Sequence, residues 1–280
     1  MPELPEVQTL VNDLNEAGLV GTTITGAGVF WPKTIARMNP WEFQVQISGR
    51  QIKKIRRRAK YIIFDLSGSR HLLVHLRMTG RLHLSAPGNE RLKHEHVILH
   101  LDDGRQLRYH DTRKFGRFNL VTDVGEIIGG LGLEPLDPEF TLSSFNAAIV
   151  RRNRQIKPLL LDQTVIAGLG NIYVDEALWQ AKIHPLRLSS SLQSKEVRAL
   201  HRSIPMVLQK GIDNQGTSLG NGKSNFYSVA RRQGRNKDEL NVFHRTGQPC
   251  LRCGTAIERL IVGQRSTHIC PKCQRLKTAG

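Results

Sequence analysis

The sequence has few features of a membrane or secreted protein. None of its apolar runs approaches the ~18 residues that a membrane span needs. Its start lacks the charged segment and apolar stretch that mark a signal peptide. Cysteine is absent before residue 250, and no internal repeat is present. We therefore expect a cytoplasmic protein without a membrane partner.

Acidic residues are also scarce. The chain has 24 Asp+Glu against 41 Lys+Arg, so its formal net charge is +17 and its pI is about 10.3. Such an excess indicates a polyanionic partner. Nucleic acid is favoured over a membrane because no stretch combines a basic face with a large apolar one. The cluster IKKIRRRAKY, residues 52–61, indicates nucleic-acid contact, a solvated basic strand or a nuclear-import tag.

The first half of the 280-residue chain combines one helix with many short strands. Apolar residues at i, i+3, i+4 and i+7 from Val7 to Leu14 predict an amphipathic helix. Residues 22–121 are rich in strand patterns. Residues 61–78 predict two strands around Ser-Gly-Ser, and residues 96–111 predict two more around Asp-Asp-Gly. This pattern favours an antiparallel sandwich or barrel.

The second half is predicted to be helical. Residues 125–140 are rich in glycine and proline without periodicity, which indicates an interdomain hinge. Beyond it, Thr141 is a predicted helix cap and Pro158 opens a second helix. A third helix follows a glycine-rich turn and stops before Pro185, and residues 195–211 carry a fourth.

All four cysteines lie near the end of the chain, in CLRC and CPKC. Two C-x2-C pairs separated by 16 residues have the spacing of a tetrahedral zinc site. Two disulfides are the alternative, which a cytosolic chain disfavours. Four thiolates leave no coordination position for water, so we expect one structural Zn²⁺ that folds the module and takes no part in catalysis. The predicted ligands are Cys250, Cys253, Cys270 and Cys273.

Two short segments are weaker candidates for phosphate binding. IERLIVGQRSTHI, between the cysteine pairs, predicts a β-hairpin with GQRS at its tip. Arg265 in this tip is placed to clamp a phosphate, or it is a solvated turn residue. GLGN at residues 168–171 precedes a predicted helix, and amides at a helix N-terminus can bind phosphate. A lone glycine turn is weak evidence.

Histidine is concentrated between residues 71 and 110, which raises the hypothesis of a second metal site around His94 and His96. No cysteine or clustered carboxylate completes a ligand set there. Exposed strand histidines near a phosphate backbone are therefore the favoured interpretation.

Seven motifs occur in one order: MPELPEV, RRAKY, HLRMTG, DTRKFG, LGLEPL, GLGNIY and CxxC…QRSTHxCPxCQ. As an ordered set, from Pro2 to about Gln274, they resemble the formamidopyrimidine-DNA glycosylase family, bacterial base-excision enzymes for oxidised purines. The resemblance implies an α+β fold with a leading helix, an N-terminal antiparallel β-sandwich, a helix-two-turns-helix module and a C-terminal β-hairpin zinc finger. DNA would lie in the cleft between the halves. The implied domains are residues 1–133, a hinge at 134–140, a helical DNA-binding module at 141–239 with a lesion-capping loop at 217–240, and a zinc finger at 240–280.

The resemblance makes Pro2 the nucleophile once the initiator methionine is removed. A free secondary amine can attack C1′ of the damaged nucleotide, displace the base and form an iminium. Glu3 is the implied general acid/base for sugar-ring opening and elimination, and Glu6 supports the site. The iminium acidifies the C2′ proton, so base removal and cleavage of the abasic strand by β,δ-elimination share one intermediate.

The same resemblance implies four phosphate contacts, which should make binding depend on salt. Lys60 would contact the phosphate beside the lesion; otherwise it is one more solvated charge in a basic strand. The other three implied contacts are His75, Asn171 and Arg265.

The damaged nucleotide must also leave the duplex, because Pro2 cannot reach a stacked base. By resemblance, Met78 and Arg113 fill the vacated space and Phe115 wedges beside the opposite base. Without the resemblance, Met78 and Phe115 would be interpreted as core residues.

Two segments depart from the family pattern. VFHR at residues 242–245 replaces a VYGR-like stretch, and residues 217–240 match no pattern, so lesion preference stays open. The endonuclease VIII branch, which prefers oxidised pyrimidines, is a close alternative, but MPELPE and DTRKFG favour the purine branch. A non-catalytic zinc-containing DNA-binding protein is the other alternative, and it would not need a free Pro2. The expected substrate is double-stranded DNA with oxidised bases or abasic sites, bound by a nucleoid-associated monomer.

Overall fold

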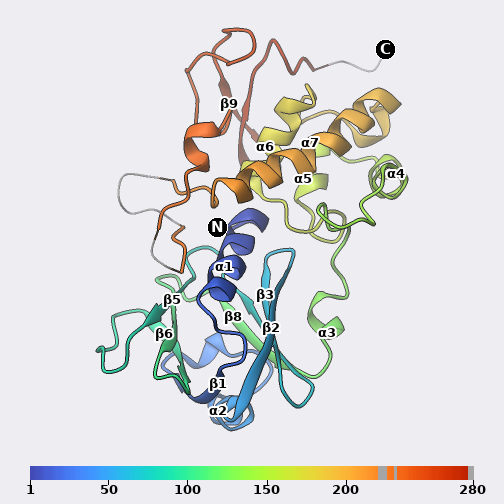
Figure 1. Cartoon of the computed structure of the whole chain (residues 1–280). Helices are drawn as coiled ribbons and strands as arrows, with labels where there is room; N and C mark the ends of the chain where they lie inside the picture. The colour runs from blue at the N-terminus through green and yellow to red at the C-terminus, as the bar shows by residue number, and fades with distance from the viewer. Residues whose placement is uncertain (220–225, 230–231, 277–280) are drawn as a thin grey trace. The chain divides into compact units, whose positions relative to one another are not determined.

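The computed structural model describes residues 1–219, 226–229 and 232–276 (Figure 1). Its chain forms two compact units. Unit 1 comprises Met1–Gly130 and Ile212–Lys237, and unit 2 comprises Leu131–Gly211 and Asp238–Gly280. The described residues of this second segment, 212–219, 226–229 and 232–237, thus belong to unit 1, whereas the predicted boundaries place them in the helical module. The predicted domain boundaries stay a prediction.

Unit 1 begins with helix α1 (Leu4–Glu16), as the apolar spacing predicts. The side chains of Val7, Leu10, Val11 and Leu14 are all buried in one core cluster. Pro5 lies in the first turn, where its missing amide costs no hydrogen bond. The helix contacts β2 and β3 of the adjoining sheet, so burial of this apolar face fixes the start of the chain to the sheet.

The strands of unit 1 form an antiparallel sheet in the order β5-β7-β6-β1-β2-β3-β4-β8. β1 and β2 share only a short pairing, Thr23↔Gln51 and Ile24↔Arg50. Apolar side chains from both halves of the sheet meet in one core, which gives the predicted sandwich. The bounds are β1 (Thr23–Val29), β2 (Arg50–Arg58), β3 (Tyr61–Leu66), β4 (Arg70–His75), β5 (Arg81–Ser85), β6 (Glu95–Leu101), β7 (Gln106–His110) and β8 (Arg117–Val121).

The two predicted hairpins are confirmed. β3 and β4 pair around Ser67–Ser69, and β6 and β7 pair around residues 102–105. Two side chains from the later segment of unit 1, Phe226 and Val229, belong to the same core cluster. The remaining elements of unit 1 are α2 (Pro40–Ile47), α3 (Gly125–Ile128) and the 3-10 helix η1 (Pro32–Thr34), whereas the 3-10 helix η3 (Asn236–Glu239) begins in unit 1 and ends in unit 2.

Unit 2 is helical, with a terminal hairpin. Thr141 caps its first helix by accepting a hydrogen bond from the Ser144 amide at 3.1 Å, as predicted. The second helix starts two residues before Pro158, whose missing amide is harmless in the first turn. The third ends at Gln180 because Lys182 adopts a left-handed φ of 60°. The elements are α4 (Leu142–Val150), α5 (Ile156–Leu161), α6 (Asn171–Gln180), η2 (Ser189–Ser191), α7 (Ser194–Asp213), β9 (Glu258–Val262) and β10 (Arg265–Ile269).

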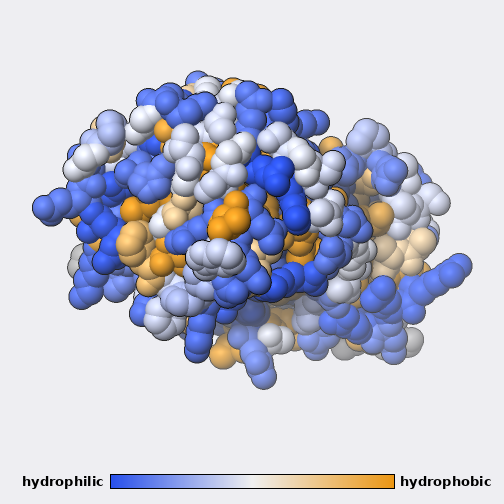
Figure 2. Space-filling model, turned by 90° about the horizontal axis from the view of Figure 1, so that it is seen from below, coloured by the Kyte–Doolittle hydropathy of each residue, from blue (hydrophilic) through white to orange (hydrophobic). Residues whose placement is uncertain are grey.

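The surface is mostly hydrophilic. Figure 2 shows one face on which hydrophilic residues surround a few hydrophobic groups. Within residues 1–219, 226–229 and 232–276, no helix has the length and apolar content to cross a bilayer. Singly exposed apolar side chains are ordinary on proteins, and Trp41 of α2 is one, 69% exposed. Exposure alone therefore assigns no role to an apolar side chain here.

Candidate active site and nucleic-acid interface

The start of α1 brings two buried carboxylates next to Pro2. The Pro2 side chain is buried, and Glu3 and Glu6 are only 3% and 1% exposed. The Glu6 carboxylate accepts hydrogen bonds from the Glu3 amide at 2.8 Å and from the Thr217 amide at 2.7 Å. Glu6 therefore fixes the backbone beside Pro2 to the first residues of the predicted capping loop. The supporting role that the family resemblance implies for Glu6 stays a prediction.

The amine at the chain terminus lies in a charged, partly desolvated environment. Burial lowers the pKa of the Met1 amine, and the positive charges of Lys60 and Arg113 lower it further. The negative charges of Glu3 and Glu6 raise this pKa. These shifts belong to the Met1 amine, so they describe the charged surroundings of the chain terminus and not the Pro2 amine itself.

Lys60 and His75 lie at neighbouring strand ends. Lys60 follows Ala59 in the tight turn between β2 and β3, where Ala59 has a left-handed φ of 51°. Tyr61, the first residue of β3, pairs with His75, the last of β4, and their rings contact edge to face at 4.7 Å. Lys60 and His75 are 6% and 8% exposed. The positive charge of Lys60 contributes to lowering the pKa of His75, as expected for neighbours.

Met78, Arg113 and Phe115 project from two loops of unit 1. Met78 is 39% exposed in the loop between β4 and β5, and Phe115 is 46% exposed in the loop between β7 and β8. The Arg113 guanidinium lies over the Phe115 ring, 4.8 Å from its centroid. Met78 and Phe115 are therefore not core residues. Their exposed apolar tips have the character needed for insertion between bases.

Asn171 and Arg265 are brought together in unit 2. The hairpin turn consists of Gly263 and Gln264, both left-handed, and Arg265 begins β10 with an exposed side chain. The Asn171 side-chain amide, at the first position of α6, donates to the Ser266 carbonyl at 2.8 Å. The two predicted phosphate contacts are thereby held on adjacent elements.

The four cysteines form a site that fits zinc. Their Sγ atoms all lie within 4.8 Å of one another, and Cys253 Sγ is 3.4 Å from Cys270 Sγ. Tetrahedral zinc with bonds of about 2.3 Å separates its sulfurs by about 3.8 Å. The Cys273 amide also donates to Cys270 Sγ at 3.4 Å, a contact suited to a thiolate. Cys250 packs with Trp179 in a small apolar cluster, so the site is joined to α6.

Among the described side chains, the four cysteines are the one group arranged to hold a metal ion. His94 and His96 belong to no such group. Their rings are 6.3 Å apart, and His96 Nε2 is hydrogen-bonded to the Asp111 carbonyl at 2.8 Å. The interpretation as exposed strand histidines is wrong for both residues, since His96 of β6 is buried at 6% exposed and His94 is half-buried just before this strand.

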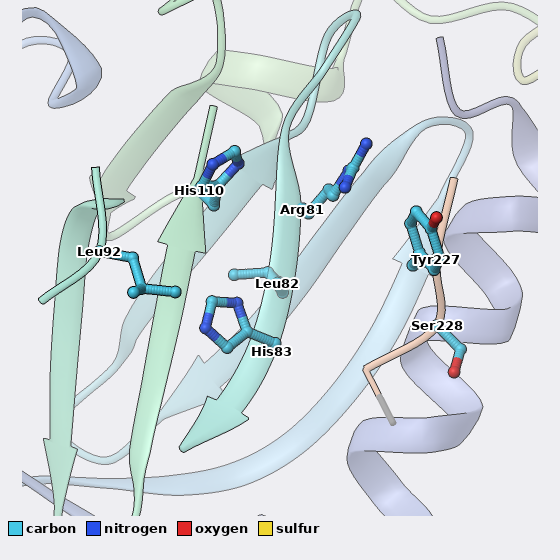
Figure 3. Close-up of a pocket in the computed structure, with 7 residues that line it drawn as sticks. All are labelled: Arg81, Leu82, His83, Leu92, His110, Tyr227 and Ser228. Carbon is cyan, nitrogen blue, oxygen red and sulfur yellow. The ribbon is translucent and has the colours of Figure 1, made fainter. Parts of the chain in front are cut away.

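The predicted capping loop is described in part, since residues 220–225 and 230–231 lie outside the described residues. Tyr227 and Ser228 line a cavity of about 260 Å³ together with side chains of β5 and β7 (Figure 3). The Arg81 guanidinium lies 4.8 Å from the centroid of the Tyr227 ring. The Val229 amide donates to Asp13 of α1 at 2.9 Å. These contacts hold Tyr227 and Val229, in the middle of the predicted loop, against Arg81 of β5 and Asp13 of α1.

Sequence reasoning missed several buried polar contacts that position these groups. Lys157 and Asp175 are both 0% exposed and form an ion pair of 2.6 Å between α5 and α6. Lys157 also donates to the Ser266 carbonyl at 3.1 Å, and the His268 amide donates to Asp175 at 2.9 Å. No local pattern predicts such a pair, because its members lie on different helices.

Three family models match the chain in order. The model described as Formamidopyrimidine-DNA glycosylase N-terminal domain matches residues 1–118. The model described as Formamidopyrimidine-DNA glycosylase H2TH domain matches residues 131–222. The model described as Zinc finger found in FPG and IleRS matches residues 247–276. Together they cover the three modules that the sequence motifs predict.

Full-length relatives and solved structures agree with these matches. Formamidopyrimidine-DNA glycosylase of Protochlamydia amoebophila is 50% identical over 275 residues, which cover 98% of this chain and 100% of that protein. The Herpetosiphon aurantiacus enzyme is 47% identical over 277 residues, with coverage of 98% and 100%. A Lactococcus lactis FPG mutant in complex with Fapy-dG-containing DNA has a TM-score of 0.90 and 36% identity, over 98% of this chain and 100% of that one. The Lactococcus lactis Fpg complex with abasic-site DNA has a TM-score of 0.89 at 36% identity and the same coverage. The chain belongs to the formamidopyrimidine-DNA glycosylase family.

Proposed function

We propose that this protein, a base-excision repair glycosylase of oxidised purines, uses the amine of Pro2 as its nucleophile and Glu3 as its acid/base. One observation carries the proposal. Pro2 and the carboxylates of Glu3 and Glu6 are buried together at the start of α1. That combination supplies a nucleophile and a proton donor within one turn of helix.

The first step forms a covalent intermediate. With Met1 removed, the Pro2 nitrogen attacks C1′ and the bond between C1′ and the base breaks. The base leaves with the bonding electron pair and takes the proton that the Pro2 nitrogen gives up. The sugar ring then opens, O4′ accepts a proton from Glu3, and the Pro2 nitrogen forms an iminium with C1′. Glu6 holds the Glu3 backbone in place through its hydrogen bond.

The second step cleaves the strand from the same intermediate. The iminium withdraws electrons from C2′, so the deprotonated Glu3 can remove a C2′ proton. The electron pair forms a C2′–C3′ double bond and expels the 3′ phosphate. A further elimination removes the C4′ proton, forms a C4′–C5′ double bond and expels the 5′ phosphate, and water then hydrolyses the iminium to release the sugar remnant from Pro2.

The DNA would be held by side chains from both units. Lys60 and His75 in unit 1, and Asn171 and Arg265 in unit 2, are proposed to contact phosphates. Lys60 is a cation that is only 6% exposed. Such a side chain is better placed to bind one phosphate directly than to interact with solvent as a surface charge. A cytoplasmic, nucleoid-associated location would follow from DNA as the substrate.

Borohydride trapping on a duplex with 8-oxoguanine tests this proposal. Wild-type protein should form a covalent adduct, and mass spectrometry should locate it on Pro2 of a chain without Met1. Glu3→Gln should lower excision about 10²- to 10⁴-fold, the usual contribution of a general acid/base. Pro2→Gly should lose most trapping and excision, whereas Pro5→Ala, which alters the second proline of the same turn, should retain both.

Two outcomes would contradict the proposal. If borohydride traps no protein and Pro2→Gly binds DNA like wild type, the chain acts as a non-catalytic DNA-binding protein. If thymine glycol is excised in preference to 8-oxoguanine, the substrate class is oxidised pyrimidines.

A further inference from the structure

The loops that carry Met78 and Phe115 rest on one buried carboxylate. Asp111, only 1% exposed, accepts hydrogen bonds from the backbone amides of Phe115 at 2.8 Å, Gly116 at 2.9 Å and Arg113 at 3.1 Å. The Asp111 carboxylate also accepts a hydrogen bond from the Thr79 hydroxyl, which lies in the neighbouring loop. Thr79 directly follows Met78 in the chain. Asp111 therefore joins the two loops through a single side chain.

Tyr109 completes this arrangement from the core. Its hydroxyl donates to Asp111 at 3.0 Å, and its ring is 1% exposed. An added Cβ at Gly116 would lie 1.5 Å from the Tyr109 hydroxyl oxygen, and one at Gly80 would lie 2.5 Å from it. Both glycines are thus required for the phenol to reach the carboxylate. This explains in physical terms why the segments RMTG and DTRKFG each end in glycine.

We infer that Tyr109 and Asp111 are positioning residues for base eversion, because they lock the Met78 loop and the Arg113–Phe115 loop into one rigid unit. The inference rests on the proposed function, in which these three tips enter the duplex. An inserted wedge must hold its shape while it displaces stacked bases, at a cost of a few kcal/mol. Loops that moved independently would have to be ordered during insertion, which would weaken the transition state.

The charges of this pair favour a permanent structure. Hydrogen bonds from Thr79, Tyr109 and the backbone amides lower the pKa of Asp111 despite its burial, so the carboxylate stays ionised at neutral pH. Burial and the Asp111 charge raise the pKa of Tyr109, so the phenol stays a donor. The arrangement therefore persists with or without DNA, as preorganisation requires.

Tyr109→Phe and Thr79→Val test the inference, since each removes one hydroxyl at nearly constant volume. We expect each variant to lower excision of 8-oxoguanine from duplex DNA about tenfold, the effect of losing one hydrogen bond to a charged group. Cleavage of an abasic site in a single-stranded oligonucleotide, where no opposite base is displaced, should stay within about twofold of wild type. Thr112→Ala, which alters an exposed threonine of the same loop, is the matched control and should behave like wild type.

A second measurement does not depend on catalysis. 2-Aminopurine placed opposite an abasic analogue should brighten when saturating wild-type protein unstacks it, and Tyr109→Phe should reduce this amplitude. Parallel loss of duplex and single-strand cleavage, or no loss in either variant together with an unchanged amplitude, would overturn the inference. Absence of trapping and excision by the wild-type protein would instead overturn the proposed function, so the two failures are distinguishable.

Discussion

His75 is a buried imidazole whose protonation the structure defines. The Arg77 amide donates to Nδ1 at 3.0 Å, so the proton of the neutral ring lies on Nε2. Burial, together with the charges of Arg77 and Lys60, lowers the pKa of His75 to about 3. In the DNA-free chain His75 is therefore a neutral N–H donor at neutral pH, and we expect it to contact a phosphate in that form.

We therefore predict that His75 adds no pH dependence to DNA binding between pH 8 and pH 5. His75→Gln should weaken binding about fivefold at every pH, because one neutral hydrogen bond is lost. Fluorescence anisotropy with an abasic-analogue duplex at constant ionic strength measures this. A wild-type affinity that rises on acidification more steeply than that of His75→Gln would show that the imidazole becomes charged in the complex.

The same pKa has a consequence for stability. The unfolded chain binds a proton at His75 below a pH of about 6.5, whereas the folded chain does so only near pH 3. The unfolded state thus binds more protons in this window, and the free energy of unfolding falls as the pH is lowered. His75→Gln should remove this part of the acid sensitivity in urea unfolding curves recorded between pH 7 and pH 4.

At the scale of elements, a buried ion pair holds the β9–β10 hairpin on the helices of unit 2. Lys157 of α5 contacts Asp175 of α6, and each also bonds the backbone of β10, at Ser266 and His268 respectively. Arg265 directly precedes Ser266, and Asn171 bonds the same Ser266 carbonyl. The pair therefore positions both proposed phosphate contacts of this unit.

Asp175→Asn should be strongly destabilising, because it leaves the Lys157 ammonium buried without its counter-charge. We expect the free energy of unfolding to fall by about 3–5 kcal/mol. Glu239→Gln breaks the exposed pair with Lys210 and is the control that should change stability little. If urea unfolding gives equal midpoints for Asp175→Asn and the control, the pair contributes no such energy.

The elements show where prediction from sequence succeeds. The hairpins at β3–β4 and β6–β7 follow from alternation and local turn residues, and α1 follows from its apolar spacing. Phe226 and Val229 lie in a polar, glycine-rich segment, yet they pack in the core of unit 1. The Val229 amide also bonds Asp13, 216 positions away, and no local pattern encodes such a contact. The sequence does not predict the positioning pairs Tyr109–Asp111 and Lys157–Asp175, because their contacts depend on the tertiary fold.

At the scale of the whole molecule, the ordered motifs identify the family because each supplies residues for one task, such as the nucleophile, a phosphate contact or a zinc ligand, at a fixed place in the chain. The spacing of the four cysteines, the proline near the N-terminus and the basic net charge can be recognised without a structure. The metal site is predictable since its ligands are close in sequence. What holds the site to the rest of unit 2 is visible only in the fold, where Trp179 packs with Val242, Cys250 and Ile257.

Removal of zinc should therefore disorder the terminal module and, through the loss of Arg265, weaken DNA binding. The protein should contain one zinc per chain by elemental analysis, and Cys253→Ser should lower this content, because four thiolates complete the site. Chelation should disorder the hairpin that carries Arg265, and so weaken duplex binding and excision together. Chelation should change the fluorescence of Trp179, which is buried beside the metal site. Trp179→Phe should abolish this change in fluorescence. Trp41→Phe, which alters an exposed tryptophan, should leave the change as in wild type. A chelated protein that keeps wild-type affinity for duplex DNA would show that Arg265 does not depend on the metal, and that the hairpin is held by Lys157 and Asp175 alone.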